Sequence, residues 1–356
     1  MTGTPFLEGR VGDKVAARTV DAKLGEVLEV FVAVPGTLGG KATVFGDSGA
    51  RGRVSFGDAG CGVPSVSWQR VEPLMEHVNT PSPNRDVKVY ANAVVFGPKH
   101  GTWIGFDKLE YSATPIDHQG PSLRTKTAQP SPHLGIVDRG WRNPLGVMRL
   151  SATVEWLGGV KKTAGISDIH DGQISPTVFR YTFRSGDDFA GWLTSFFNVP
   201  YLFGSAGQGV RGQAERYIGA DCADVLVAAL RRAGVKIDYS SVAEMVGKVP
   251  RVAGPVELAA CDPDDIPEGG CVPTTLHWGR DLKAGDLLAL DYIDSAELPR
   301  PWDHIVAVLE DRGPSGTPDG VLGPEDLVVD SGDGQGLKLE NLGHQGHVRI
   351  AVLRPR

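Results

Sequence analysis

The chain has 356 residues, of which 41% are hydrophobic and 22% charged, and its formal net charge at pH 7 is −7. This length allows two or three domains with a substantial core, and the acidic balance gives no sign of a nucleic-acid partner. No apolar run reaches the roughly 20 residues that a membrane-spanning helix needs, so no membrane span is expected. The N-terminus lacks the basic and apolar regions of a signal peptide. The chain is therefore expected to be cytoplasmic, exported by another route, or given without its leader.

The first half of the chain predicts a β-rich fold. Short runs rich in Val, Phe, Tyr and Thr are separated by Gly, Pro, Asn and Asp turns, which is typical of a sandwich or barrel. The expected strands are 27–34, 41–45, 53–56, 65–71, 87–96, 103–111, 149–156 and 178–184. A stretch rich in Pro, Ser, Thr and Gly near 112–148 either divides this half or is one long excursion. We expect a β-rich domain over 1–115, with a continuation or a second small β unit over 116–184.

The character of the sequence changes after residue 184. Ser185-Gly186-Asp187-Asp188 indicates a helix start, and an apolar stripe at helical spacing follows as far as Phe197. A loop, a helix beginning near Cys222 and a short helix opening at the capping box 241–244 come next. Residues 250–280 resemble an irregular insertion. The last expected strands are 286–290, 304–309, 326–330 and 348–353. Helices followed by consecutive strands predict an α+β domain over 185–356.

Four cysteines occur, at positions 61, 222, 261 and 271. None of their spacings matches a zinc site, so neither a metal nor another cofactor is expected. Cys261 and Cys271 flank a loop rich in Pro, Gly and Asp. They form either a local disulfide or two free thiols.

Cys222 stands in the first turn of its expected helix, where unpaired N–H groups and the helix dipole favour a thiolate. On the helix alone, a small buried apolar residue is the better interpretation, as for most free cysteines. A nucleophile also needs a base and a group that orients the base. His304 begins one expected strand and Asp330 ends the next, so a shared sheet can bring their side chains together. These residues favour the nucleophile hypothesis.

Five segments in the same order resemble motifs of the NlpC-type cysteine peptidases, a papain-like family that cleaves peptide bonds in bacterial peptidoglycan. The segments are Pro200-Tyr201-Leu202-Phe203-Gly204, Gly219-Ala220-Asp221-Cys222, Lys283-Ala284-Gly285-Asp286, His304-Ile305-Val306-Ala307-Val308 and Val328-Val329-Asp330. The resemblance covers about 192–356. Three departures stand out. Ala223 and Asp224 replace the usual Ser-Gly, and Asp330 occupies a position that is more often His. The insertion between the Cys222 helix and the strand that begins near Gly285 is longer than in minimal members.

The resemblance implies an α+β chain in which a papain-like catalytic domain follows a β-rich region. Cys222 is then the nucleophile, His304 the proton carrier and Asp330 its orienting group. Tyr201 and Asp221 are implied to contact substrate, although a helix cap explains Asp221 equally well. The implied activity is hydrolysis of peptidoglycan stem peptides in the cell envelope. The alternatives are a transglutaminase-like or other acyl-transferring enzyme, and a non-catalytic envelope-binding protein with a relic site.

Overall fold

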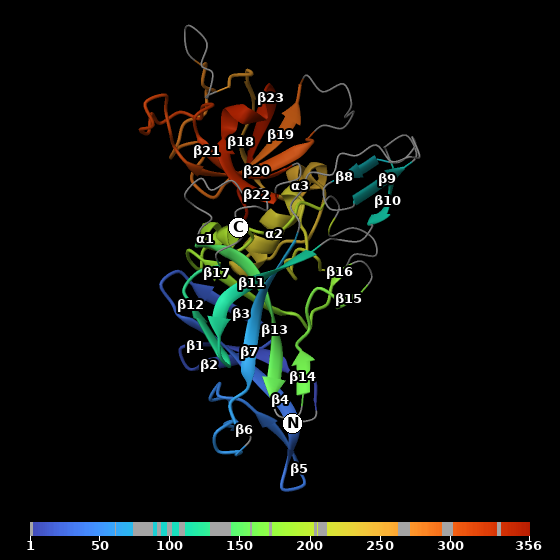
Figure 1. The fold of residues 1–356 in the computed structure, drawn as a ribbon. Coiled ribbons are helices and arrows are strands. Elements are labelled where there is room, and N and C mark those ends of the chain that lie inside the picture. The colour runs from blue at the N-terminus through green and yellow to red at the C-terminus, as the bar shows by residue number, and fades with distance from the viewer. Residues whose placement is uncertain are drawn as a thin grey trace. The chain divides into compact units, whose positions relative to one another are not determined.

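A computed structural model describes most of the chain, and its residues form two compact units (Figure 1). The described residues are 3–60, 62–73, 88–90, 94–97, 102–106, 111–128, 144–156, 159–170, 173–202, 205, 212–262, 271–293, 302–332 and 336–356. One unit is Met1–Gly186 with Thr194–Pro200, and the other is Asp187–Leu193 with Tyr201–Arg356.

The first unit is built from two six-stranded sheets and two smaller ones. The first sheet has the order β2 (Lys14–Ala17), β1 (Phe6–Val11), β4 (Leu28–Leu38), β5 (Lys41–Phe45) and β6 (Arg53–Val54), with β12 (Ser122–Thr125) also paired to β4. The second has the order β11 (Tyr111–Gln119), β7 (Ser65–Pro73), β13 (Gly146–Trp156), β17 (Phe179–Arg184) and β3 (Thr19–Lys23), with β14 (Gly159–Lys162) paired to β13. The smaller sheets are β10 (Thr102–Phe106), β9 (Val94–Gly97) and β8 (Lys88–Tyr90), and the pair β15 (Ile169–His170) and β16 (Gln173–Ile174).

Strand β1 shows why this unit was only partly predictable. Its Glu8 is buried, and it accepts a hydrogen bond from Ser48 Oγ at 2.6 Å and pairs with Arg53. These partners lie about 40 residues further along the chain, so the segment has no local pattern that marks a buried strand. A carboxylate is tolerated in such a position only because it is paired and hydrogen-bonded.

The second unit combines one large sheet with short helices. Its antiparallel sheet has the order β18 (Arg251–Leu258), β23 (Val348–Leu353), β19 (Leu287–Tyr292), β20 (His304–Glu310), β21 (Leu327–Gly332) and β22 (Gly336–Asn341). The helices are α1 (Phe189–Thr194), which ends at the unit boundary, α2 (Cys222–Arg232), α3 (Val242–Lys248) and the short 3₁₀ helix η2 (Leu342–Gln345). Helix α2 packs against β20 and β21, and Figure 1 shows it beside the sheet.

The register of this sheet places the polar site residues on the same face as a hydrophobic cluster. Leu290 pairs with His304, and Val328 pairs with Glu340. Because side chains alternate along a strand, His304 shares its face with Val306 and Val308. The cluster consists of Leu258, Leu276, Leu282, Leu288, Leu290, Val306, Val308, Leu322, Val328, Leu342, Val348, Ile350 and Val352. The site therefore lies at the edge of the unit's core.

The predicted α+β class, with a papain-like catalytic domain, is wrong. Of the described residues, 46% lie in strands and only 10% in helices, so the fold is mostly β. The predicted helices exist but are short, and α1 ends at Thr194, before the predicted stripe is complete. Strand β18 occupies the segment expected to be irregular, and β22 was not predicted. Pairing with distant strands, which the local sequence pattern does not show, stabilises both.

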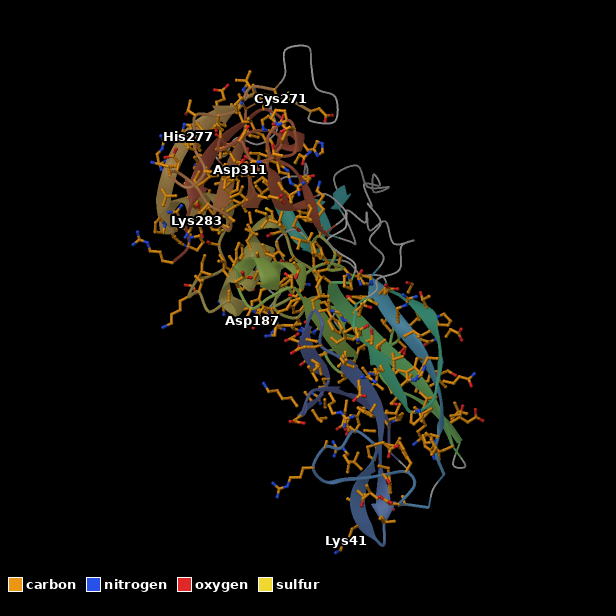
Figure 2. The ribbon with its side chains drawn as sticks, turned by 90° about the vertical axis from the view of Figure 1, so that its left-hand side faces the viewer. Lys41, Asp187, Cys271, His277, Lys283 and Asp311 are labelled. Atoms are coloured by element: carbon orange, nitrogen blue, oxygen red, sulfur yellow. A yellow bond between two sulfur atoms is a disulfide. The ribbon has the colours of Figure 1, made fainter. Side chains whose placement is uncertain are left out.

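The two cysteines at 261 and 271 are joined by a disulfide, with their Cα atoms 5.7 Å apart; Figure 2 labels Cys271. Cys61 lies outside the described residues. Within the described part of the chain, no helix is long and apolar enough to cross a membrane.

Candidate active site

Cys222 is the first residue of α2, and the local sequence fixes this helix start. Asp221 is the N-cap, and its side chain accepts a hydrogen bond from the backbone N–H of Asp224 at 2.8 Å. The apolar residues that follow are buried, so the helix presents its Cys222 end to the site from a packed position. The Cys222 thiol is buried, with 7% of the residue exposed. The helix-cap interpretation of Asp221 is thus seen directly in the structure.

His304 and Asp330 meet across the adjacent strands β20 and β21. His304 Nε2 lies 2.5 Å from Asp330 Oδ1, and the two side chains are 13% and 4% exposed. The Cys222 thiol also lies close enough to His304 for each group to shift the pKa of the other. Because Nε2 is engaged by Asp330, the other ring nitrogen, Nδ1, is the one available to the thiol. The structure therefore brings together the three residues proposed from sequence for nucleophile, proton carrier and orienting group.

Burial and the neighbouring carboxylates set the protonation of this group. Burial raises the pKa of the Cys222 thiol, and this outweighs the lowering effect of His304. Burial lowers the pKa of His304, but the Asp330 carboxylate and the hydrogen bonds outweigh it and raise this pKa well above its usual value. Burial raises the pKa of Asp330, but His304 overcomes this and holds it well below its usual range. The resting site is thus a neutral thiol beside an imidazolium–carboxylate pair.

A second set of polar residues surrounds Asp330, and sequence reasoning missed it. Lys338 Nζ lies 3.4 Å from Asp330 Oδ2 and 2.6 Å from Glu340 Oε2. Gln345 Nε2 donates to Glu340 Oε1, and the Tyr292 hydroxyl donates to Gln345 Oε1 at 2.7 Å. The alternation Leu337-Lys338-Leu339-Glu340 was the available signal. The usual interpretation of this alternation exposes Lys338 and Glu340 to water, whereas in the structure both border the site.

Tyr201 lies near the helix start through its backbone. It forms a β-bridge with Ala220, and Leu202 N donates to Ala220 O at 3.2 Å. Gly219 is required for this approach because a Cβ there would lie 2.6 Å from Leu202 Cβ. The motifs around Tyr201 and Asp221 are therefore adjacent in space.

Asp224, which stands where the NlpC-type motif usually has Gly, is buried and accepts a hydrogen bond from Ser205 Oγ. It therefore ties the chain before the helix to its first turn.

Asp286 acts as another structural tie. It accepts two hydrogen bonds from Arg354, from Nε at 2.8 Å and Nη2 at 2.7 Å, and a third from Lys283 N at 2.9 Å. Asp286 thus holds the beginning of β19 to the last residues of the chain.

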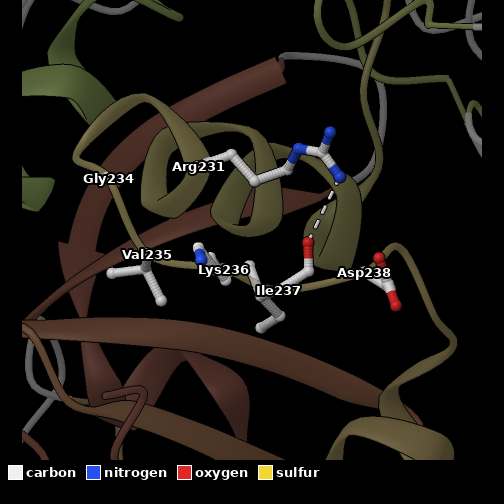
Figure 3. A pocket seen from close by; sticks show the side chains of 6 residues that line it. All are labelled: Arg231, Gly234, Val235, Lys236, Ile237 and Asp238. Atoms are coloured by element: carbon white, nitrogen blue, oxygen red, sulfur yellow. Dashed lines mark hydrogen bonds between the residues drawn. The ribbon is translucent and has the colours of Figure 1, made fainter.

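A cavity of about 440 Å³ lies at the opposite end of α2, and Figure 3 shows its lining. The lining residues are Arg231, Gly234, Val235, Lys236, Ile237 and Asp238. Arg231 Nη1 donates to Ile237 O at 3.2 Å. Because a helix rises about 1.5 Å per residue, this end lies about 15 Å from Cys222. The cavity therefore does not belong to the cysteine site.

Among the described residues, no group of three or more His, Cys, Asp and Glu side chains is arranged to hold a metal ion. A scan against protein-family models, a search of curated proteins and a search of solved structures each found no match.

Proposed function

We propose that this chain is a cysteine hydrolase that cleaves amide bonds in peptidoglycan stem peptides, as the NlpC-type peptidases it resembles do. The observation that carries the proposal is the contact series from Cys222 through His304 to Asp330, with 2.5 Å between His304 Nε2 and Asp330 Oδ1. A nucleophile, a base within hydrogen-bond reach and a third group that orients the base form the arrangement that acyl transfer requires. The peptidoglycan substrate is inferred from the ordered motifs between residues 200 and 330.

The reactive form is a Cys222 thiolate beside the His304 imidazolium. The thiolate forms when the thiol releases its proton to water, and Asp330 keeps the imidazolium protonated meanwhile. The sulfur then attacks the substrate carbonyl carbon, and the carbonyl π electrons move to oxygen. The backbone N–H of Cys222, in the first turn of α2, is suited to stabilise that oxyanion.

His304 carries the proton through the remaining steps. As the tetrahedral intermediate collapses, the C–N bond breaks and the imidazolium donates its proton to the leaving amine. Neutral His304 then accepts a proton from a water molecule that attacks the thioester. The second collapse releases the carboxylic acid product and the Cys222 thiolate. Asp330 holds the ring in one orientation throughout and fixes its tautomer while it is neutral.

The disulfide between Cys261 and Cys271 supports a location outside the reducing cytoplasm, since such bonds persist in oxidising compartments. This agrees with the cell-envelope setting that the sequence resemblance implies. We therefore include an envelope location in the proposal.

Incubation with defined muropeptides, followed by mass spectrometry, tests this proposal. We expect new fragments that differ from the substrate by the addition of water, and their loss in Cys222→Ala and His304→Ala. Cys61→Ala, which removes a cysteine of the first unit, is the matched control and should retain activity. Amine incorporation in place of cleavage would indicate an acyl transferase. Absence of both reactions, with iodoacetamide labelling Cys222 no faster than Cys61 at any pH, would overturn the enzyme assignment.

A further inference from the structure

Asp330 is held from both of its carboxylate oxygens. Oδ1 contacts His304 Nε2 at 2.5 Å, and Oδ2 lies 3.4 Å from Lys338 Nζ. Two separate contacts fix the plane of a carboxylate, whereas one contact leaves it free to rotate about its Cβ–Cγ bond. The orientation of His304 therefore depends on Lys338 as well as on Asp330.

The sheet register delivers these residues to one face. Asp330 pairs with Lys338 and Val328 pairs with Glu340, so alternate positions of β22 face the same side as Asp330. Glu340 is buried, with 5% exposed, and its Oε2 lies 2.6 Å from Lys338 Nζ. Glu340 thus holds the ammonium group that in turn holds Asp330.

The contacts that begin at Asp330, Lys338 and Glu340 lead back to the face of the His304 ring. Gln345 bridges Glu340 to the Tyr292 hydroxyl, and the Tyr292 ring stacks on His304 with centroids 6.2 Å apart and planes 26° from parallel. Burial raises the pKa of Tyr292 to about 12, so its hydroxyl remains a donor to Gln345 across the ordinary pH range. The imidazole is therefore restrained at Nε2 and on one ring face by groups that are linked to each other.

We propose that Lys338 and Glu340 are positioning residues, which fix the Asp330 carboxylate and through it the orientation and charge of His304. The inference rests on the proposed function for its catalytic meaning. The charged and titratable groups that interact with His304 are Cys222 on α2, Tyr292 on β19, Asp303 just before β20 and Asp330 on β21, whereas Lys338 and Glu340 on β22 act through Asp330. Lys338 and Glu340 carry opposite charges, so their effects on the protonation of His304 can be told apart.

Substitutions at the two positions should move the protonation of His304 in opposite directions. Lys338→Met removes a cation near Asp330, so His304 should keep its proton to a higher pH. Glu340→Gln keeps the shape and one of the two acceptor oxygens but removes a negative charge in alkaline solution. His304 should then lose its proton at a lower pH. A purely structural role would lower stability without this opposed pair of shifts.

The measurement is a proton–carbon NMR titration of the histidine ring Cε1–H, with the His304 signal identified by its absence in His304→Ala. Muropeptide hydrolysis gives the second readout. There, Lys338→Met should lower kcat roughly tenfold or more with little change in KM, because misplaced catalytic groups slow the chemical step. Lys338→Arg should recover most of that loss. Glu244→Gln and Lys248→Met, which break an exposed Lys–Glu pair of 3.0 Å on α3, are the matched controls and should change neither readout.

Different results would contradict the positioning role of Lys338 and Glu340 and the proposed hydrolase function. Midpoint shifts of the same sign, or none, in folded Lys338→Met and Glu340→Gln would overturn the positioning role even if the wild type hydrolyses muropeptides. If Lys338→Met does not fold, Lys338→Gln takes its place in the titration. Opposite shifts in a protein that cleaves no muropeptide would support the positioning role and count against the proposed substrate.

Discussion

The buried pair of His304 and Asp330 predicts that Asp330→Ala destabilises the second unit most strongly in mildly acidic solution. The wild-type pair is shielded from water and its atoms are 2.5 Å apart. Removing one partner of a buried ion pair leaves an uncompensated charge and costs roughly 3–5 kcal/mol. Above about pH 6.5 the stranded histidine can release its proton, so the loss should shrink there.

The direction of this pH dependence follows from how folding shifts the pKa of Asp330 and of His304. Asp330 has a lowered folded-state pKa, so its contribution is present above about pH 4 and is lost as the pH falls through the folded value. His304 has a raised folded-state pKa. Its contribution is therefore complete below about pH 6.5 and is lost as the pH rises through the folded value. Both contributions are complete together only between roughly pH 4 and 6.5.

Hydrogen–deuterium exchange of the β20 and β21 amides measures this local stability without requiring the whole chain to unfold. At pH 5.5 we expect exchange in Asp330→Ala to be faster than in the wild type by roughly a hundredfold or more, and by clearly less at pH 8.5. Glu310→Gln, at the end of β20, is the control because it breaks an exposed pair of 2.7 Å with Arg312. Its effect should stay below about fivefold. An Asp330→Ala ratio that is the same at both pH values would refute the reasoning.

Three further predictions concern the rest of the second unit. Asp221→Ala should lower its thermal stability by about 1 kcal/mol through loss of the helix cap, whereas Asp221→Asn keeps the cap. Asn also removes a charge that raises the Cys222 pKa, so iodoacetamide should label Cys222 faster at a fixed pH; slower labelling would contradict this. Burial raises the pKa of Asp326 to about 7. Its ionisation should therefore lower stability as the pH rises from about 4 to 7, a slope that Asp326→Asn should remove and calorimetry can measure. Replacing Cys261 and Cys271 by serine should cost roughly 2–3 kcal/mol in the same assay, and dithiothreitol should have no effect on that variant.

The parts of the site on α2 and at the start of β20 could be predicted because their signals are local. Asp221 precedes an apolar run at helical spacing, which marks a capped helix whose first residue is Cys222. His304 precedes four buried residues of β20, which marks a strand. Neither inference needs knowledge of a distant partner. Each therefore survives an error in the fold class.

The missed elements depend on distant partners. Strand β22 carries Lys338 and Glu340 into a buried corner, where Asp330 and Gln345 satisfy their charges and hydrogen bonds. Read alone, the same residues indicate a solvent-facing strand or a loop. Polar groups can be buried only when partners are present, and those partners come from other elements. The local sequence therefore underestimates strands whose polar face borders a site.

The α+β class is wrong although Cys222, His304 and Asp330 lie together, and one physical reason explains both results. The class was inferred from the order of helices and strands, but three short helices contribute few residues beside six strands of the second unit and the sheets of the first. The proposed chemistry needs only one helix start and two neighbouring strands. A mostly β chain can supply both, since Cys222 requires one turn of α2 and the His304–Asp330 contact requires one sheet register. Helical content is therefore a poor guide to whether this constellation can form, and the Asp330→Ala exchange experiment tests the contact itself.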